Sequence, residues 1–340
     1  MESRAPPREP SDGLRGWSRV WLGSIKVAVG LGLLGALFLW GRIDLQVLSG
    51  LAESPGTVAA CTILIFLLLP LGALRWGLLL GALQISIPFA KLFHFVGIGM
   101  VMNMFLLGSV GGDAARGLYA WRAVGYGSAR IAISLVADRL LGLLALLSIA
   151  LAFAAFNWHW MRHIPALAAL GVALFAIVGG AIAAASATYY VSRLALPIEE
   201  RHSHWRRLAG LIGRARDLVL LVRTRPWHLL AAFALSLAIH ICVVAGVVAI
   251  AAAAGIGGLA TADYMFAVPL TLVANAMPST PNGIGVGEAA FDQICRWLEP
   301  VPTGAAYSSI FLAFRAICML ACLPGFVSLA LYRNIPKPPA

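Results

Sequence analysis

The chain has 340 residues, of which 61% are hydrophobic and only 11% are charged. A soluble globular protein carries about 25% charged residues, so this chain cannot cover a core of its size with polar surface. The composition also excludes disordered, coiled-coil, collagen-like and disulfide-scaffold proteins. The apolar runs are long and continuous, which predicts an all-α integral membrane protein.

Basic residues exceed acidic residues by 25 to 14, which gives a formal net charge of +11. In a soluble protein this excess would favour nucleic-acid binding. Here the basic residues lie between apolar runs, where they orient the spans and contact anionic lipid headgroups. We therefore expect a membrane environment and no nucleic-acid partner.

Six runs have about the 20 apolar residues that a helix needs to cross a bilayer. They follow a polar, proline-containing segment, 1–19, which we expect to be disordered and cytoplasmic. The first run lacks a signal-peptide cleavage site and is expected to be retained as a span. The six predicted spans are 22–41, 57–80, 128–156, 164–191, 228–255 and 305–332.

Two further apolar runs, 88–107 and 263–278, are interrupted by glycine and polar residues. If both re-enter the membrane as helical hairpins, the second with 285–297 as its returning arm, the basic residues obey the positive-inside rule. Nineteen of the 25 then lie on the cytoplasmic side, three outside and three within spans. This topology predicts a bacterial cytoplasmic (inner) membrane protein with both termini cytoplasmic and with 114–130, including Arg116, on the cytoplasmic side.

Residues 201–226 carry apolar residues at helical spacing and several arginines. We interpret this segment as a basic amphipathic helix on the inner leaflet, with a solvated linker as the alternative. It would interrupt the second of two membrane repeats. The first repeat spans 20–156, and the second begins with 157–200 and continues through 227–334.

The two repeats share a pattern of asparagine, glycine-rich turn, acid and arginine. Asn103 and Asp113 are ten residues apart, and Arg139 follows 26 residues later. The second half repeats the order with Asn275, Glu288 and Arg315 at separations of 13 and 27 residues. Because the halves start on opposite sides of the membrane, the pattern predicts an inverted-topology repeat, whose binding site is expected near the membrane midplane.

Three arginines, at positions 75, 139 and 315, lie inside predicted spans, where a charge is costly unless it is paired or functional. Their expected partners are Asp113, Asp138 and Glu288. Either the ion pairs only hold helices together, or the arginines bind a phosphate bidentately while the acids position them or carry a proton. The predicted substrate site comprises Arg75, Asn103, Gly111, Gly112, Asp113, Asp138, Arg139, Asn275, Pro281, Gly283, Gly285, Glu288 and Arg315.

The sequence gives no motif for catalysis, a metal or a cofactor. The five cysteines lack metal-ligand spacing. The GIGVG run at 283–287 follows no strand, so it does not predict a dinucleotide site. His240 lies in the middle of a span, where a hydrogen-bonded structural histidine is the simpler interpretation. We therefore expect no cofactor and no enzymatic activity, with an intramembrane enzyme as a weaker alternative.

Four segments resemble the flippase-like membrane domain of lysylphosphatidylglycerol synthases and the stand-alone membrane proteins of that family. They are Arg75-Trp76, NMFLLGSVGGDAAR at 103–116, ADRLLG at 137–142 and AMPSTPNGIGVGE at 276–288. Leu107 departs from the family, which often has proline there. The sequence contains no counterpart of the synthases' aminoacyl-transferase domain, so the resemblance implies movement of lipid between leaflets rather than lysine transfer.

These observations favour a lipid translocase, or flippase-like transporter, for an amphiphile with an anionic headgroup. A phospholipid and a polyprenyl-phosphate lipid both have this chemistry. The alternative is a membrane subunit that presents lipid to a separate glycosyltransferase or lipid-modifying enzyme. Transport by the purified, reconstituted protein would distinguish the two.

Overall fold

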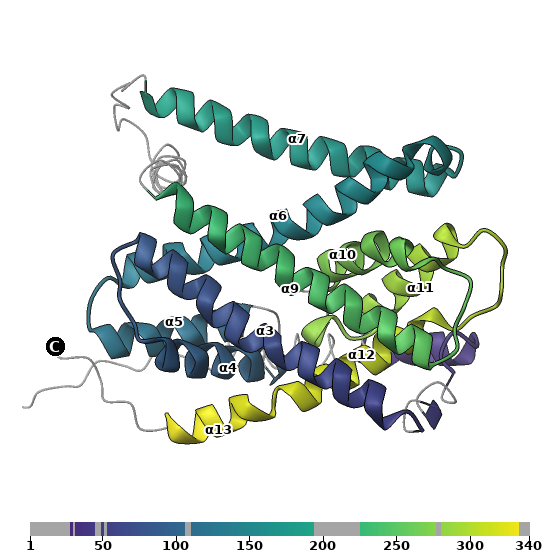
Figure 1. Ribbon diagram of the computed structural model, residues 1–340, viewed down its shortest axis with the longest axis horizontal. Coiled ribbons are helices and arrows are strands. Elements are labelled where there is room, and N and C mark those ends of the chain that lie inside the picture. The colour runs from purple at the N-terminus through teal and green to yellow at the C-terminus, as the bar shows by residue number, and fades with distance from the viewer. Residues whose placement is uncertain are drawn as a thin grey trace, which may run out of the picture.

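The computed structural model describes residues 28–29, 31–44, 49–50, 53–105, 110–193, 225–276 and 280–332, and within them the chain is helical without a strand (Figure 1). Residues 31–39 form the helix that precedes α3. The remaining elements are α3 (Pro55–Ala82), α4 (Phe89–Phe105), α5 (Val110–Val124), α6 (Ser128–Met161), α7 (Pro165–Arg193), α9 (Pro226–Ala253), η1 (Thr261–Asp263), α10 (Tyr264–Asn275), η2 (Pro281–Gly283), α11 (Val286–Leu298), α12 (Tyr307–Ala321) and α13 (Leu323–Leu331).

The long helices begin where proline allows them to begin. Pro55, Pro165 and Pro226 are the first residues of α3, α7 and α9. Proline is favoured there because its ring presets a helical φ, and the amide hydrogen that it lacks would have no partner in the helix. Pro70 and Pro269 lie inside α3 and α10.

Four of the predicted spans form helices that are long and apolar enough to cross a membrane: Pro55–Ala82, Ser128–Met161, Pro226–Ala253 and Tyr307–Leu331. The last is divided at Cys322 into α12 and α13. The predicted span 164–191 corresponds to α7, whose described apolar part, Pro165–Gly180, is shorter. The predicted span 22–41 lies partly outside the described residues.

Two short helix pairs occupy the positions of the predicted hairpins. α4 packs against α5, and α10 packs against α11. In Figure 1 the first pair lies at the left of the bundle and the second at the right. The two pairs come together because η2, in the turn of the second pair, contacts α4 of the first.

The return arm of the first pair corrects one expectation. Residues 114–124 belong to α5 rather than to a cytoplasmic segment. Arg116 is only 8% exposed. The positive-inside rule treats a basic residue as solvated, whereas Arg116 is paired with two carboxylates inside the bundle.

The bundle is held together by apolar packing between the two halves. α3 lies along α9, and α6 packs against α10. α13 reaches back to α4, where an added Cβ at Gly325 would meet the backbone of Gly97. α7 packs on α6 and lies apart from the other described helices in Figure 1.

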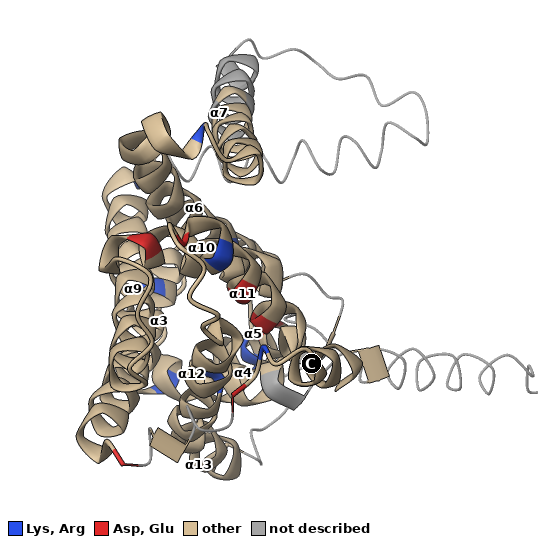
Figure 2. Cartoon of the chain, turned by 90° about the vertical axis from the view of Figure 1, so that its right-hand side faces the viewer, with Lys and Arg blue, Asp and Glu red and all other residues tan. Residues whose placement is uncertain are grey.

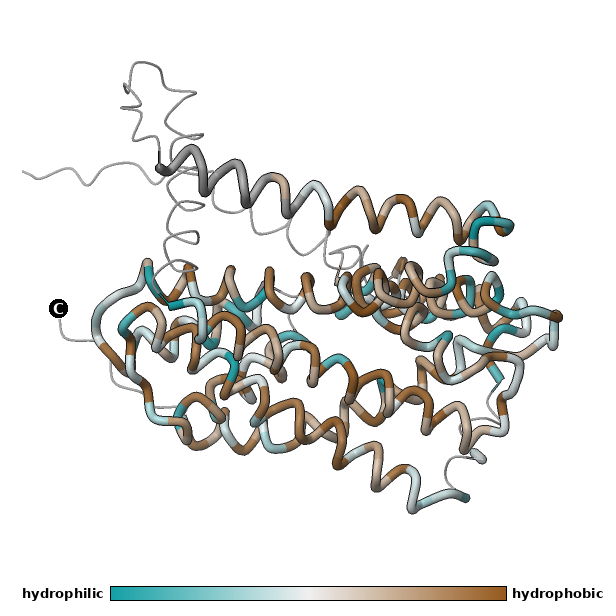
Figure 3. The backbone as a smooth tube through the Cα atoms, turned by 45° about the horizontal axis from the view of Figure 1, so that its top comes forward, coloured by the Kyte–Doolittle hydropathy of each residue, from teal (hydrophilic) through white to brown (hydrophobic). Residues whose placement is uncertain are grey.

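Charged residues are few along the described helices (Figure 2). Brown, hydrophobic stretches dominate the long helices in Figure 3. The predicted disordered segment 1–19 lies outside the described residues, as do residues 201–224 of the predicted amphipathic helix and the turn that contains Leu107.

Candidate functional site

A chain of alternating arginines and aspartates connects α3, α5 and α6. Arg75 Nε lies 2.6 Å from Asp138 Oδ1, and the other carboxylate oxygen of Asp138 lies 2.8 Å from Arg116 Nη2. The same Arg116 nitrogen lies 2.8 Å from Asp113 Oδ1. Asp113 Oδ2 is in turn 2.5 Å from Arg139 Nε. We call these five residues the charge chain.

The charge chain is buried at one end and exposed at the other. The Asp138 side chain is 3% exposed and the Arg116 side chain 9%, whereas the Arg139 side chain is 42% exposed. Arg75 also donates a hydrogen bond from Nη1 to Ser236 Oγ at 3.1 Å. The guanidinium of Arg116 lies 5.0 Å from the centre of the Trp76 ring, close enough for a cation–π contact. Arg139 is therefore the arginine of the charge chain that is most accessible to a ligand.

Asn103 and Gly112 fix the position of Asp113. The Gly112 amide donates to Asn103 Oδ1 at 2.9 Å, which satisfies one of the unpaired amides at the start of α5. A Cβ at Gly112 would overlap the Gly99 carbonyl oxygen and the Asn103 side chain. Glycine is therefore required where α5 approaches α4.

In the second half, Arg315 holds the turn before α11. Its Nε lies 2.6 Å from Glu288 Oε1, and its Nη1 donates to the Asn282 carbonyl at 2.7 Å. Its Nη2 lies 3.1 Å from Asn275 Oδ1 and 3.3 Å from the Gly283 carbonyl. We call Arg315 and these partners the turn clamp.

The turn clamp is closed to ligands. The Glu288 side chain is 0% exposed and the Arg315 side chain 11%. Glu288 Oε2 also accepts a hydrogen bond of 2.8 Å from the Gly285 amide, as in a capping box. Asn282 and Gly283 have positive φ angles of 50° and 67°. Such a backbone needs support, and Arg315 supplies it through both carbonyl oxygens.

The two halves place corresponding residues in corresponding contacts. Each acid pairs with the arginine expected from its spacing, at 2.5 Å for Asp113–Arg139 and 2.6 Å for Glu288–Arg315. The residue before each acid, Gly112 or Gly287, is glycine. A Cβ at either would come within 2.7 Å of the Asn103 or Asn275 side chain. The shared spacing therefore corresponds to a shared geometry.

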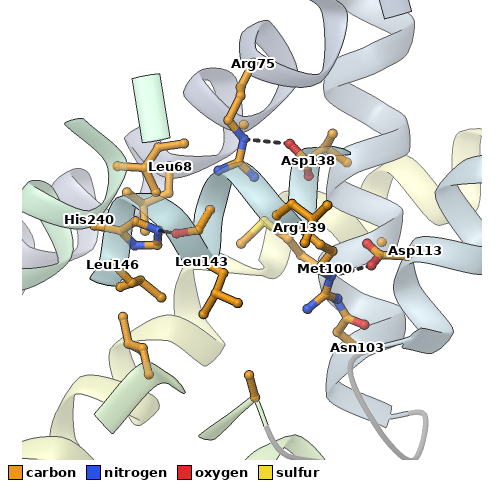
Figure 4. Close-up of a pocket in the computed structure, with 18 of the residues that line it drawn as sticks. Leu68, Arg75, Met100, Asn103, Asp113, Asp138, Arg139, Leu143, Leu146 and His240 are labelled. Atoms are coloured by element: carbon orange, nitrogen blue, oxygen red, sulfur yellow. Dashed lines mark hydrogen bonds and ion pairs between the residues drawn. The ribbon is translucent and has the colours of Figure 1, made fainter. Parts of the chain in front are cut away.

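A cavity of about 510 Å³ lies between α3, α4, α6, α9 and α10 (Figure 4). Arg75, Asn103, Asp113, Asp138 and Arg139 line its polar part. Apolar residues line the rest: Leu68, Val96, Met100, Leu140, Leu143, Leu146, Ile239, Leu272 and Val273. The cavity therefore combines a cationic end with an apolar wall.

His240 lies across the cavity from Arg139, and its Nε2 is 3.1 Å from the Gly142 carbonyl oxygen. Because a carbonyl only accepts, Nε2 carries the hydrogen of this bond. An added Cβ at Gly142 would lie 3.5 Å from Arg75 Nη1 and 4.0 Å from His240 Nε2. The expected structural histidine is thus also part of the cavity wall.

The structure divides the predicted site into two parts. Arg75, Asn103, Asp113, Asp138 and Arg139 line the cavity, with Gly112 behind them. The second-half residues do not line it: Asn275, Gly283, Glu288 and Arg315 form the turn clamp, and Gly285 caps α11. Gly111 lies in the first turn of α5, and Pro281 begins η2.

Sequence reasoning missed Arg116, which joins the two aspartates of the charge chain. One signal was present, because Asp113 and Arg116 are three residues apart and such residues are neighbours on a helix. The contact with Asp138 required α5 to pack on α6. Ser236 and Trp76 were missed as well, and neither has a local sequence signal.

The model of the protein family described as "Lysylphosphatidylglycerol synthase TM region" matches residues 23–325. Comparison with curated proteins gives no significant match. Comparison with solved structures also gives none. The family match includes the charge chain, the turn clamp and the cavity.

Proposed function

The chain belongs to the lysylphosphatidylglycerol synthase transmembrane family and is a multi-pass membrane protein, and on that premise we propose that it moves an anionic lipid between leaflets. The observation that carries this proposal is the cavity, whose cationic end contains Arg139 and whose wall is apolar. An amphiphile presents the same two chemistries. We propose no catalytic step.

In this proposal the headgroup contacts Arg139. Its guanidinium is the most exposed of the charge chain and offers a planar fork to phosphate oxygens. Arg75 and Arg116 are positioning residues, because their ion pairs with Asp138 hold the helix that carries Arg139. The headgroup shares Arg139 with Asp113, so binding and release do not require a buried arginine to lose every partner.

We further propose six spans and two re-entrant helical hairpins arranged as an inverted repeat. The matched ion pairs and the matched glycine–asparagine contacts of the two halves support this arrangement. The basic residues place both termini in the cytoplasm of a bacterial cell, on the inner side of the cytoplasmic membrane. Rocking of one half against the other would then alternate access to the cavity.

Transport is tested with purified protein in liposomes that carry a fluorescent anionic lipid in the inner leaflet. A membrane-impermeant quencher reports its arrival in the outer leaflet. We expect faster arrival with the protein than without it, and faster movement of anionic than of zwitterionic lipid. Arg139→Gln is expected to abolish the difference between the lipids. Equal rates with and without protein, for every lipid, would contradict the proposal.

Gly142→Leu provides a matched block of the cavity, because Gly142 lies on its wall and a leucine would project between Arg75 and His240. We expect it to stop transport while the protein remains folded. If the protein binds anionic lipid but does not move it, the alternative function of presenting lipid to a separate modifying enzyme is favoured. An imposed proton gradient then separates coupled transport from scrambling.

A further inference from the structure

The cavity has an excess of one positive charge. The three guanidinium groups of the charge chain face two carboxylates. Asp113 and Asp138 are the acids that line the cavity among the described residues, and each contacts two arginines, which keeps both carboxylates ionised. His240 contacts a carbonyl and lies beside Arg75, so a second positive charge there is disfavoured.

An uncompensated charge is costly in these surroundings, because the wall of the cavity is apolar and the charge chain is largely buried. One negative charge on a ligand would neutralise the excess. A second negative charge would lack a partner and would face the carboxylate of Asp113. The same low polarity that strengthens binding of the first charge therefore opposes the second.

We infer that the cavity selects headgroups with a single negative charge, that is, a phosphodiester rather than a phosphomonoester or a diphosphate. The inference rests on the proposed function and narrows its substrate class. A glycerophospholipid and a sugar joined to a polyprenol through one phosphate both contain such a diester. A volume of about 510 Å³ lies in the range that encloses a drug-sized group, so it suits a headgroup whose chains extend between the helices.

The test compares two lipids with the same acyl chains that differ by one charge. Phosphatidylmethanol is a monoanionic diester, and phosphatidic acid carries two charges at about pH 8.5, above the second phosphate pKa near 6. Binding to the full chain is measured by native mass spectrometry, with phosphatidylcholine as the zwitterionic reference. We expect the diester to bind about tenfold more tightly, which corresponds to about 1.4 kcal/mol.

Two variants raise the charge of the cavity by one and should shift its preference. Asp113→Asn removes a carboxylate, and Met100→Lys adds a cation on the cavity wall without removing a group of the charge chain. Both are expected to improve binding of phosphatidic acid relative to phosphatidylmethanol by about tenfold. Asp263→Asn changes the net charge equally but lies in η1 away from the cavity, and it should leave the ratio unchanged.

The outcomes separate the inference from the proposed function. If neither anionic lipid binds better than phosphatidylcholine, and Arg139→Gln has no effect, the proposed function fails. If anionic lipids bind but phosphatidic acid binds at least as well as the diester, only the charge inference fails. It also fails if folded Met100→Lys and Asp113→Asn proteins behave like Asp263→Asn.

The source of the diester is a separate arm of the experiment. A polyprenyl phosphate and its hexosyl diester are compared in the same way. A preference for the hexosyl diester supports the inference with a polyprenyl source, whereas a preference for phosphatidylmethanol over both supports it with a glycerophospholipid source. Tighter binding of the polyprenyl phosphate than of either diester would overturn the inference.

Discussion

Arg139 and Asp113 are 26 residues apart in the chain, yet Arg139 Nε lies 2.5 Å from Asp113 Oδ2 at the edge of the cavity. Arg315 and Glu288 repeat this pair with a separation of 27 residues and a distance of 2.6 Å. The environments differ, because the Arg139 side chain is 42% exposed and the Arg315 side chain 11%. Equivalent arginines are therefore expected to respond differently to the same substitution.

Arg139→Lys is expected to weaken lipid binding while leaving the fold intact. Lysine keeps the charge but loses the planar fork that contacts two phosphate oxygens. Loss of one charge-assisted hydrogen bond costs about 1.5–3 kcal/mol, or roughly ten- to a hundredfold in affinity. The measurements are thermal unfolding and lipid affinity on the same purified protein. Arg122→Lys, outside the cavity, is the control, and equal affinity of the two folded variants would remove Arg139 from the site.

Glu288→Gln is expected to destabilise the protein strongly. The substitution leaves the buried Arg315 without its carboxylate and weakens the cap of the Gly285 amide. Breaking a buried ion pair costs about 3–5 kcal/mol. We expect a lower thermal midpoint, whereas Glu53→Gln, at an exposed position, should leave it unchanged. An unaltered midpoint for Glu288→Gln would show that the turn clamp contributes little to stability.

Gly112→Ala and Gly142→Ala form a matched pair. A methyl group at Gly112 overlaps the Gly99 carbonyl and the Asn103 side chain, whereas at Gly142 its nearest neighbours are 3.5 Å and 4.0 Å away. Overpacking of this kind costs about 1–3 kcal/mol. Only Gly112→Ala is expected to lower the thermal midpoint and the affinity for lipid. Equal midpoints would mean that α4 and α5 separate without penalty.

Trp76→Phe is expected to loosen the buried end of the charge chain. Trp76 is fully buried, donates from Nε1 to Ser134 Oγ at 2.9 Å and lies beneath Arg116. Phenylalanine removes the hydrogen bond and weakens the cation–π contact. A double-mutant cycle with Ser134→Ala should give a coupling energy of about 1 kcal/mol. Additive effects would show that the hydrogen bond is not a net source of stability.

The sequence by itself determined the membrane class and most of the long helices. Runs of about 20 apolar residues have few alternatives to a helix in a bilayer, because the backbone must satisfy its own hydrogen bonds there. The spacing of acid and arginine was also sufficient to predict the pairs Asp113–Arg139 and Glu288–Arg315. In an apolar interior a charge requires a partner, and few were available.

Only the tertiary structure decided which arginine faces a cavity. Arg139 and Arg315 follow their acids at almost the same distance, so no local pattern distinguishes them. Arg315 is enclosed by the carbonyl oxygens of its own turn, whereas Arg139 lies beside the space left between α3, α4, α6, α9 and α10. Arg116 joined the charge chain because α5 packs on α6, which brings residues 22 positions apart into contact. Exposure and charge balance depend on how helices pack, and packing between distant segments leaves no periodic signal in the sequence.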